Sequence, residues 1–509
     1  FSGGGSRSLS ITLGALRALT ALELMGRVDA ISSVSGGSWA SSIYMFAKMD
    51  PEELLGGSTT PSALTMRELG RTPPPLGETA TNNVIKVAMG LFQDTNYNDL
   101  WIKTFAEALL KPFGLGDTET YMAASAESVE EIVRANPQLH PAQFLVPQTG
   151  RPRTLVMSGT LLAPEGHTGD GYNAVSLQMS PDWTGSPFYP DNRRVSYEST
   201  GHVREKNPLL ADMVVGGGLV ESFAFGGQAP AQQSGGSGIT LEAPPVPFSL
   251  ARAVGISSAA FAALMSQVPF FSDTAAKLVP KADYWPVMSA SFPGTQAAMR
   301  YELGDGGNLE NGGLLPMLQR GARRIAWFVN TDVGLSGSVD FCSAASVGPD
   351  ADMAGLVTDQ LSDKFGFRGG SRGMQSSFLD NNQVFETAEF FALVCELQAE
   401  RDAGKPAVAL KSLRVQQNHW WGIEGGFEVD LLVVYNDKSS DFVAALPEDT
   451  QEELRKGGGG AFAHFPWFKT VMQNTGQFTS YTAQQVNLLA AHSEYAVQRH
   501  ADLFRKLFQ

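Results

Sequence analysis

The first fifty residues alternate between helical and strand-like hydrophobic spacing. Leucines recur every third residue within 8–26, which predicts a helix that ends at Gly26. The short β-prone run 28–33 predicts a buried strand, and helical spacing returns over 36–49. A helix, a strand, a turn and a second helix in so short a stretch indicate a layered α/β fold.

The rest of the chain continues this alternation around two irregular stretches. Residues 50–150 begin rich in Pro, Thr, Asn and Gly and then become helical, so we expect an inserted cap rather than core sheet. Residues 226–247 consist mainly of Gly, Gln, Ser and Pro, which predicts a flexible loop, and an apolar helical stretch follows over 248–265. Helices are expected at 99–111, 124–135, 312–320 and 482–508, and strands at 153–162, 174–179, 324–330, 412–417 and 427–435.

Composition narrows the function classes. The 509 residues include 37 Lys and Arg against 52 Asp and Glu, a net charge of −15, which disfavours nucleic-acid binding and broad attraction to anionic membranes. No apolar run is long enough for a transmembrane helix. The two cysteines, Cys342 and Cys395, are expected to be buried small hydrophobes. Together with the lack of an N-glycosylation sequon, they favour a reducing, cytoplasmic compartment.

Ser35 lies at the predicted turn between the first strand and the second helix. This position exposes a serine hydroxyl and directs the helix N-terminus at charge that develops on a substrate, as a nucleophile requires. Ser33 lies inside the strand and Ser38 inside the helix, so Ser35 is the candidate nucleophile. A Ser-Gly-Gly sequence is also common in ordinary turns, and that alternative stays open.

A run of three glycines, Gly3 to Gly5, precedes the first helix. Its backbone N–H groups could stabilise an oxyanion, and Arg7, one turn into the helix, suits an anionic ligand. The run could instead be a flexible helix start. A nucleotide-phosphate site is poorly supported, because no Gly-Lys-Ser/Thr follows and the dinucleotide-binding spacing is missing.

The candidate base is a carboxylate. Asp305 follows a strand-like run within a Gly-Asp-Gly-Gly turn, and the helix and strand after it repeat the layout around Ser35. A Ser–Asp dyad needs no histidine if the carboxylate reaches the hydroxyl, although such a turn can also be only a turn. None of the seven histidines lies in an evident catalytic context: His140, His167, His202, His419, His464, His492 and His500.

These motifs together resemble the catalytic domain of the cytosolic phospholipase A2 and lysophospholipase family, which is related to patatins. The resembling segments are Ser2-Gly3-Gly4-Gly5-Ser6-Arg7, Ser35-Gly36-Gly37-Ser38-Trp39, Leu177-Gln178-Met179-Ser180-Pro181, Gly216-Gly217-Gly218-Leu219-Val220, Phe223-Ala224-Phe225 and Asp305-Gly306-Gly307. One departure is Ser33, which stands where many relatives have glycine.

The resemblance implies a role for each matched residue. Ser35 is the nucleophile and Asp305 the base, and Gly4 and Gly5 form the oxyanion hole. Arg7 holds the substrate phosphate. A second family arginine, in a Gln-Arg-Gly tripeptide, matches Arg320, which could equally be a charge at a helix C-terminus.

The resemblance also implies a fold. We expect a three-layer α/β/α architecture with a central, mostly parallel or mixed sheet and helical cap insertions. One catalytic domain is expected over 1–509, with the cap at 50–150 and a flexible loop and candidate lid at 226–290. Because the first motif normally follows a strand, an upstream strand is expected to be missing.

The implied function is hydrolysis of fatty-acyl esters of phospholipids or lysophospholipids at a membrane or micelle surface, through an acyl-enzyme and without cofactor or metal. The expected location is cytoplasmic, with peripheral association with membranes. The alternatives left open are a triacylglycerol lipase or acyltransferase with the same dyad, a lipid-binding pseudoenzyme, and a Ser-His-Asp hydrolase.

Overall fold

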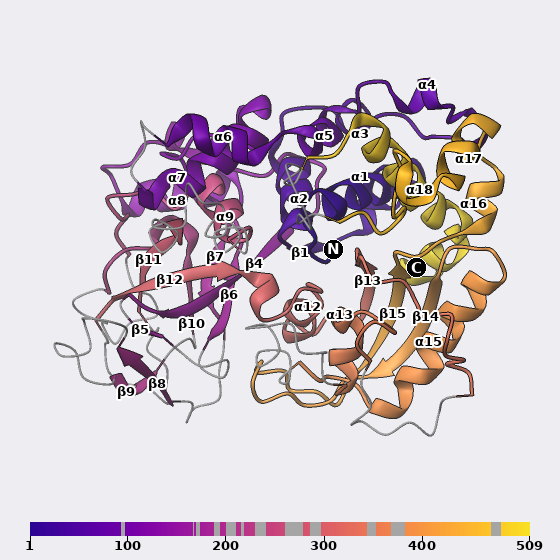
Figure 1. The fold of residues 1–509 in the computed structure, drawn as a ribbon. Helices are drawn as coiled ribbons and strands as arrows, with labels where there is room; N and C mark the ends of the chain where they lie inside the picture. Colours follow the sequence, from indigo (N-terminus) through magenta and orange to yellow (C-terminus); the bar gives the residue numbers. More distant parts are fainter. Residues whose placement is uncertain are drawn as a thin grey trace.

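The computed structural model describes residues 1–92, 97–165, 167–168, 174–187, 194–199, 210–214, 218–229, 241–259, 278–285, 297–343, 353–367, 382–469 and 480–509. The chain begins with α1 (Gly5–Ala21), β1 (Ala30–Val34) and α2 (Gly36–Phe46), which confirms the predicted helix, strand and helix (Figure 1). Helix α1 ends before the expected Gly26, because Leu22 caps it and Glu23 takes a left-handed φ of 58°.

The first half of the chain is rich in short helices. Residues 50–150 contain α3 (Pro51–Leu55), α4 (Met66–Leu69), α5 (Pro75–Glu78), α6 (Val84–Leu91), α7 (Tyr97–Phe105), α8 (Ala126–Ala135) and the strand pair β2 (Tyr121–Met122) and β3 (Phe144–Leu145). The helices expected at 99–111 and 124–135 are thus present as α7, with a π-helical turn after it, and α8. Of the stretch 248–265, α9 (Leu250–Ile256) is helical, and residues 260–265 lie outside the described residues.

A seven-stranded sheet forms one side of the molecule (Figure 1). Its order is β10-β7-β6-β4-β12-β11, and β1 pairs with β4. These strands are β4 (Thr154–Pro164), β6 (Val175–Met179), β7 (Trp183–Ser186), β10 (Gly218–Glu221), β11 (Lys281–Tyr284) and β12 (Met299–Asp305). A smaller sheet joins β5 (His167–Thr168), β8 (Arg194–Ser199) and β9 (Leu210–Val214).

The α/β class is confirmed, but the expected mostly parallel or mixed central sheet is not, because the main sheet is largely antiparallel. Only β1 and β4 pair in parallel, and the other five pairings of this sheet are antiparallel. The connection between β6 and β7 shows the physical reason. It consists of 180–182 alone, and so short a link permits only antiparallel pairing, because parallel neighbours need a long crossover.

A three-stranded sheet forms the opposite side, with β13 (Arg324–Val329) parallel and β14 (Val408–Arg414) antiparallel to the central β15 (Glu428–Tyr435). The strand expected at 412–417 is therefore displaced toward the N-terminus. The helices of this half are α12 (Leu315–Gln319), α13 (Asp359–Ser362), α15 (Thr387–Asp402), α16 (Ser440–Ala444), α17 (Glu448–Arg455), α18 (Ala483–Arg499) and α19 (Ala501–Leu507). The last two divide the single helix expected over 482–508.

The amino end of the chain lies between the two sheets (Figure 1). The Phe1 amino group donates to Ser32 O of β1 (2.8 Å), and the Ser2 N–H donates to Phe328 O of β13 (3.0 Å). A cavity of about 310 Å³ lies beside these contacts, and its lining includes Ile31 of β1 and Ile325 of β13.

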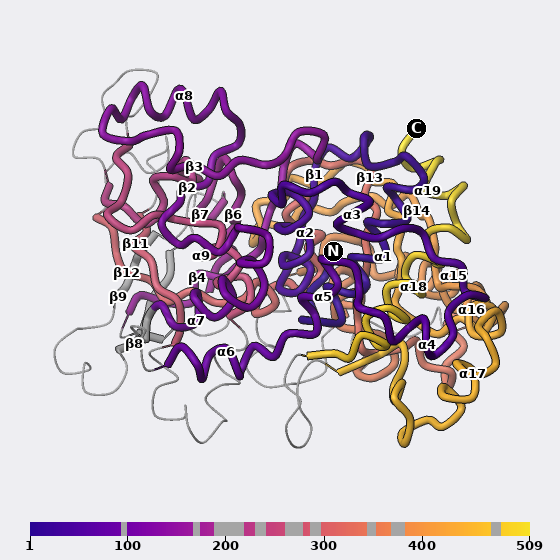
Figure 2. Tube along the Cα trace, turned by 90° about the horizontal axis from the view of Figure 1, so that it is seen from above, coloured from indigo at the N-terminus to yellow at the C-terminus, as the bar shows by residue number. Residues whose placement is uncertain are grey.

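Helices α1 and α18 lie side by side in both views and are closely packed (Figure 1, Figure 2). A Cβ added at Gly14 of α1 would lie 2.0 Å from Ala490 O of α18, so only glycine permits this approach. The Arg17 guanidinium forms an ion pair with Glu494 of α18 at 2.8 Å, and both side chains are buried. The described residues include no helix that combines the length and the apolarity needed to cross a bilayer.

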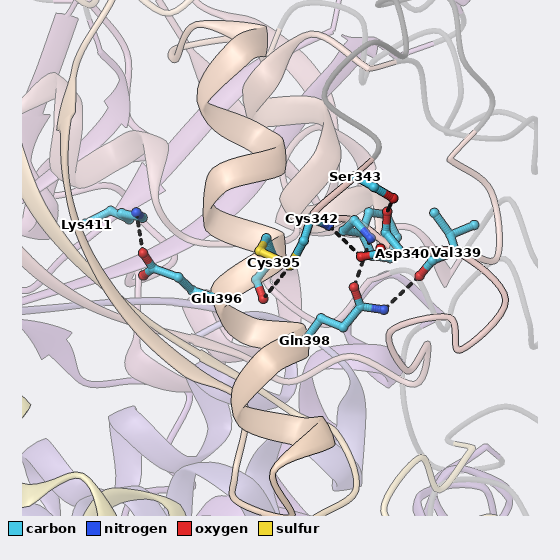
Figure 3. Close-up of a disulfide and its surroundings, with 9 residues drawn as sticks. Val339, Asp340, Cys342, Ser343, Cys395, Glu396, Gln398 and Lys411 are labelled. Atoms are coloured by element: carbon cyan, nitrogen blue, oxygen red, sulfur yellow. Dashed lines mark hydrogen bonds and ion pairs between the residues drawn. A yellow bond between two sulfur atoms is a disulfide. The ribbon is translucent and has the colours of Figure 1, made fainter.

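Cys342 and Cys395 form a disulfide that joins a loop to α15 (Figure 3). The expectation that both are buried small hydrophobes is therefore wrong, since Cys342 is exposed and Cys395 half-buried. Because the two cysteines are 53 residues apart in the sequence, no local pattern predicts their pairing. The cysteine argument for a reducing compartment also falls, because a disulfide is the oxidised form of the pair.

Candidate active site

Ser35 occupies a strained turn between β1 and α2. Its backbone has φ 50° and ψ −121°, and it is one of three described non-glycine residues with positive φ. L-residues rarely adopt this conformation, and surrounding contacts must hold it in place. One such contact is its N–H group, which donates to Ser257 Oγ at 3.1 Å, just after α9. The strain is the kind found where a serine is presented as a nucleophile.

Gly36 permits close contact between this turn and the glycine run at the start of the chain. A Cβ at Gly36 would lie 1.9 Å from Gly5 O and 2.6 Å from Gly5 C. The neighbouring atoms belong to the backbone and cannot rotate away. The glycine after Ser35 therefore brings the turn into direct contact with residues 3–5, which we call the oxyanion segment.

The oxyanion segment is shaped to present backbone N–H groups. Gly4 and Gly5 have φ of 137° and 52°, conformations that favour glycine, and α1 begins at Gly5 with no acidic residue in its first turn. The Gly3 N–H donates to Asn311 O at 2.9 Å, whereas the Gly4 and Gly5 N–H groups donate to no acceptor among the described residues. The positive end of the α1 dipole adds to the attraction for an anion here.

Asp305 ends β12 on the same side of β4 as Ser35, because residues 157–158 pair with both β1 and β6, and residues 159–161 with both β6 and β12. Val34 pairs with Ser158 and Asp305 with Gly159, so the ends of β1 and β12 meet adjacent residues of the same strand. Strands β1 and β12 thus lie end to end along one edge of β4, with their carboxyl ends facing each other. Ser35 and Asp305 therefore lie at the junction between these two strand ends.

Both candidate dyad side chains are nearly buried, with 6% of Ser35 and 2% of Asp305 exposed. The Asp305 Oδ1 atom accepts a hydrogen bond from the Gly307 N–H at 2.8 Å. Its backbone carbonyl accepts one from Thr160 Oγ1 at 2.8 Å. These contacts fix the carboxylate at the end of its strand.

Asn311 lies between the two halves of the site and was missed by sequence reasoning. A Cβ at Gly3 would lie 2.0 Å from Asn311 Oδ1 and 3.2 Å from the Ser35 Cβ. A Cβ at Gly307 would lie 2.9 Å from the same oxygen and 3.2 Å from Asp305 Oδ1. One amide side chain thus adjoins the glycines next to both dyad members. Its place between Glu310 and Gly312, in a glycine-rich loop, was the signal available in the sequence.

Arg7 is buried beside the oxyanion segment, with 4% exposed. Its guanidinium donates to Asn330 O at 2.8 Å and to Phe468 O at 2.9 Å, and it lies 3.8 Å from an Asp332 oxygen. These are contacts within the protein, and contact with a substrate phosphate stays a prediction. They also link the start of α1 to the end of β13.

Arg320, by contrast, is exposed just after α12. Its guanidinium donates to the side chain of Gln178 on β6 and to Pro316 O. Gln178 also donates to Gln319. The predicted arginine of the Gln-Arg-Gly tripeptide is therefore held beside the predicted Leu-Gln-Met-Ser-Pro segment, and its role toward a substrate stays a prediction.

Histidine hydrogen bonds in the described part of the chain do not reach Ser35. The His500 ring contacts Glu400 and Ala496 O, and the His140 ring accepts from the Ala142 N–H. His492 is buried among aromatic rings, which lowers its pKa to about 4. The described residues contain no group of three or more His, Cys, Asp or Glu side chains placed to hold a metal ion.

The rivals of Ser35 point into a cluster of hydroxyl groups beneath the turn. Ser33 Oγ lies 3.1 Å from Ser38 Oγ, and Ser257 Oγ lies 3.0 Å from the same atom. The Ser33 hydroxyl, at the position where the sequence departs from the family it resembles, thus has a hydrogen-bond partner. Phe248 and most of α9, from the predicted apolar stretch, are buried.

Comparisons with known proteins give a distant similarity. No protein-family profile and no curated protein matches the chain. The structure of human GIVD cytosolic phospholipase A2 matches with a TM-score of 0.43 and 12% identity over 100% of this chain and 59% of that one. Its complex with methyl gamma-linolenyl fluorophosphonate matches with a TM-score of 0.39 and 12% identity over 99% and 58%. At these values the likeness supports no statement about activity.

Proposed function

We propose that the chain is a serine acyl hydrolase in which Ser35 and Asp305 form a dyad and the Gly4 and Gly5 N–H groups bind the oxyanion. The observation that carries the proposal is the strained turn at Ser35, held by backbone contact against the oxyanion segment. Asp305 ends β12, whose carboxyl end faces the carboxyl end of β1 along one edge of β4. Nucleophile, base and N–H donors are the parts that acyl transfer requires.

The reaction proceeds in two steps. Asp305 accepts the Ser35 proton as Ser35 Oγ attacks the acyl carbonyl carbon, and the oxyanion receives hydrogen bonds from the two glycines. Cleavage of the ester C–O bond leaves an acyl-serine, and the proton passes to the departing alcohol. Water then attacks the acyl-serine while Asp305 takes its proton. The fatty acid departs and Ser35 regains a proton.

The motif resemblance supports a phospholipid or lysophospholipid as the substrate. Arg320 is the exposed cation of the two predicted phosphate contacts, and we assign it the headgroup phosphate. Arg7 supports the oxyanion segment through its contacts with Asn330 and Phe468. The protein would then act peripherally at a lipid surface.

Ser35→Ala and Asp305→Asn test the proposal, with Ser33→Ala as a matched control. We expect kcat to fall on the order of 10⁴-fold or more in the first two variants and to stay near the parent in the third. A fluorophosphonate should label the parent and Ser33→Ala, but not Ser35→Ala. Retained hydrolysis by Ser35→Ala would overturn the assignment.

A lipid panel decides the substrate class. Release of fatty acid from lysophosphatidylcholine vesicles, and loss of that activity in Arg320→Ala but not on a neutral ester, would support the phosphate-bearing substrate. Preference for triacylglycerol, or acyl transfer to an added alcohol, would assign the same dyad to a lipase or an acyltransferase. A parent that neither hydrolyses lipid nor reacts with the fluorophosphonate would be a pseudoenzyme.

A further inference from the structure

A buried charge cluster lies behind the loop that follows Asp305. Glu310, Asp363 and Lys364 have side chains between 0% and 2% exposed. The Lys364 ammonium lies 3.0 Å from Glu310 Oε1 and donates to Asp363 Oδ1 at 2.7 Å. Burying an ion pair costs desolvation free energy, so a buried pair is weak evidence that the pair stabilises the fold. The presence of this cluster behind the loop therefore needs an explanation other than stability.

Glu310 ties this cluster to the loop 306–313, which we call the aspartate loop. Its two carboxylate oxygens accept hydrogen bonds from the Gly312 and Gly313 N–H groups, each at 2.7 Å. The Lys364 ammonium therefore holds a carboxylate that closes the loop on itself. If the ammonium is lost, that carboxylate remains buried without its ion-pair partner.

Asn382 supplies a second connection between the cluster and the aspartate loop. Its amide group donates to Leu309 O at 2.7 Å and to Asp363 Oδ2 at 2.8 Å. Trp421 Nε1 donates to Asn382 Oδ1 at 2.9 Å, which fixes the orientation of the amide. The loop is thus held at two successive residues by one cluster.

The other face of the aspartate loop touches both parts of the candidate site. Asn311 O accepts the Gly3 N–H at 2.9 Å, and the Gly307 N–H donates to Asp305 Oδ1 at 2.8 Å. A Cβ at Gly313 would lie 3.3 Å from Phe1 O, so the loop also borders the residues just before the oxyanion segment. A shift of this loop would change the position of the base relative to the oxyanion donors.

We infer that Lys364 is a positioning residue. It acts through Glu310 on the aspartate loop and so fixes the position of Asp305 relative to the oxyanion segment. The inference rests on the proposed function and adds a part of the machinery far from Ser35 in sequence. Lys364 touches neither dyad residue in the described structure, so it contributes through geometry alone.

The test compares Lys364→Met with Arg17→Met. Arg17 pairs with Glu494 at 2.8 Å and is also buried, but it holds α1 against α18. Both variants should lose stability in urea unfolding. Per folded molecule, only Lys364→Met should lower kcat, on the order of 10²-fold for a displacement of about 1 Å, with KM within about twofold of the parent.

Two further variants keep the test valid if Lys364→Met does not fold: Glu310→Gln and the double variant Lys364→Met/Glu310→Gln. The double variant leaves no unpaired buried carboxylate at position 310. All three should lose kcat to a similar extent, since two residues that act through one loop are non-additive. Folded variants with the parent kcat would overturn the inference, as would a double variant whose loss is the product of the two single losses.

Ser35→Ala separates this inference from the proposed function. If Ser35→Ala retains hydrolysis, the proposed function fails. If hydrolysis is lost in Ser35→Ala and unchanged in folded Lys364→Met and Glu310→Gln, only the positioning role fails.

Discussion

Gly36→Ala should separate the nucleophile turn from the oxyanion segment. The three atoms nearest to the added Cβ all belong to the Gly5 backbone, at 1.9, 2.6 and 2.8 Å. Contacts below 3.0 Å require something to shift, and no side chain is available to rotate away. The α2 start must therefore move relative to the α1 start by on the order of 1 Å.

A displacement of this size should lower kcat about 10²-fold, because it lengthens the hydrogen bonds to the developing oxyanion. The overpacking should also lower the free energy of unfolding by about 1–3 kcal/mol. KM should change less than kcat, because the added methyl group disturbs the attack geometry rather than the region that binds the rest of the substrate.

The assay is ester hydrolysis per folded molecule, alongside urea unfolding. Gly14→Ala is the matched control, since its Cβ would lie 2.0 Å from Ala490 O at the α1–α18 contact and far from the turn in the fold. It should lose stability and keep its kcat. Gly57→Ala has no atom within 4 Å of the new Cβ and should change neither. A Gly36→Ala variant with the parent kcat would refute the reasoning.

Two further predictions concern stability. Burial raises the pKa of Asp437 from 3.8 to about 6, so between these values the folded protein keeps a proton that the unfolded chain releases. The free energy of unfolding should therefore fall as pH rises through this window, and urea titrations should show a smaller fall for Asp437→Asn; identical slopes would contradict this. Reduction of the Cys342–Cys395 disulfide, which spans 53 residues, should cost about 2–4 kcal/mol. Urea midpoints with and without reductant measure this loss, a Cys342→Ser variant should not respond to reductant, and an unchanged parent midpoint would count against the disulfide.

Elements whose formation depends on residues adjacent in the sequence could be predicted. Leucine spacing indicates α1, the β-prone run indicates β1, and two glycines after Ser35 favour a tight turn before α2. The turn itself is local, because a strained backbone and a close approach need particular residues at consecutive positions. For the same reason the candidate nucleophile and base could both be placed at strand ends.

The direction of the strands and the partners of the cysteines could not be predicted in this way. The pattern of β4 is buried on both faces, which is typical of parallel sheets, yet β6 and β12 pair with it in antiparallel fashion. Burial tells how much of a strand is covered and not which way its neighbours run. Cys342 and Cys395 likewise gave no local signal of their disulfide.

The sequence by itself determined the sharp turns and the residue types at Ser35, Gly4 and Asp305, because each is encoded within a few consecutive positions. Only the tertiary structure decided that Asn311 lies between the two halves of the site and that Lys364 pairs with Glu310. Such contacts join residues distant along the chain. They depend on strand register and on the burial of charge, which no local pattern of residues records.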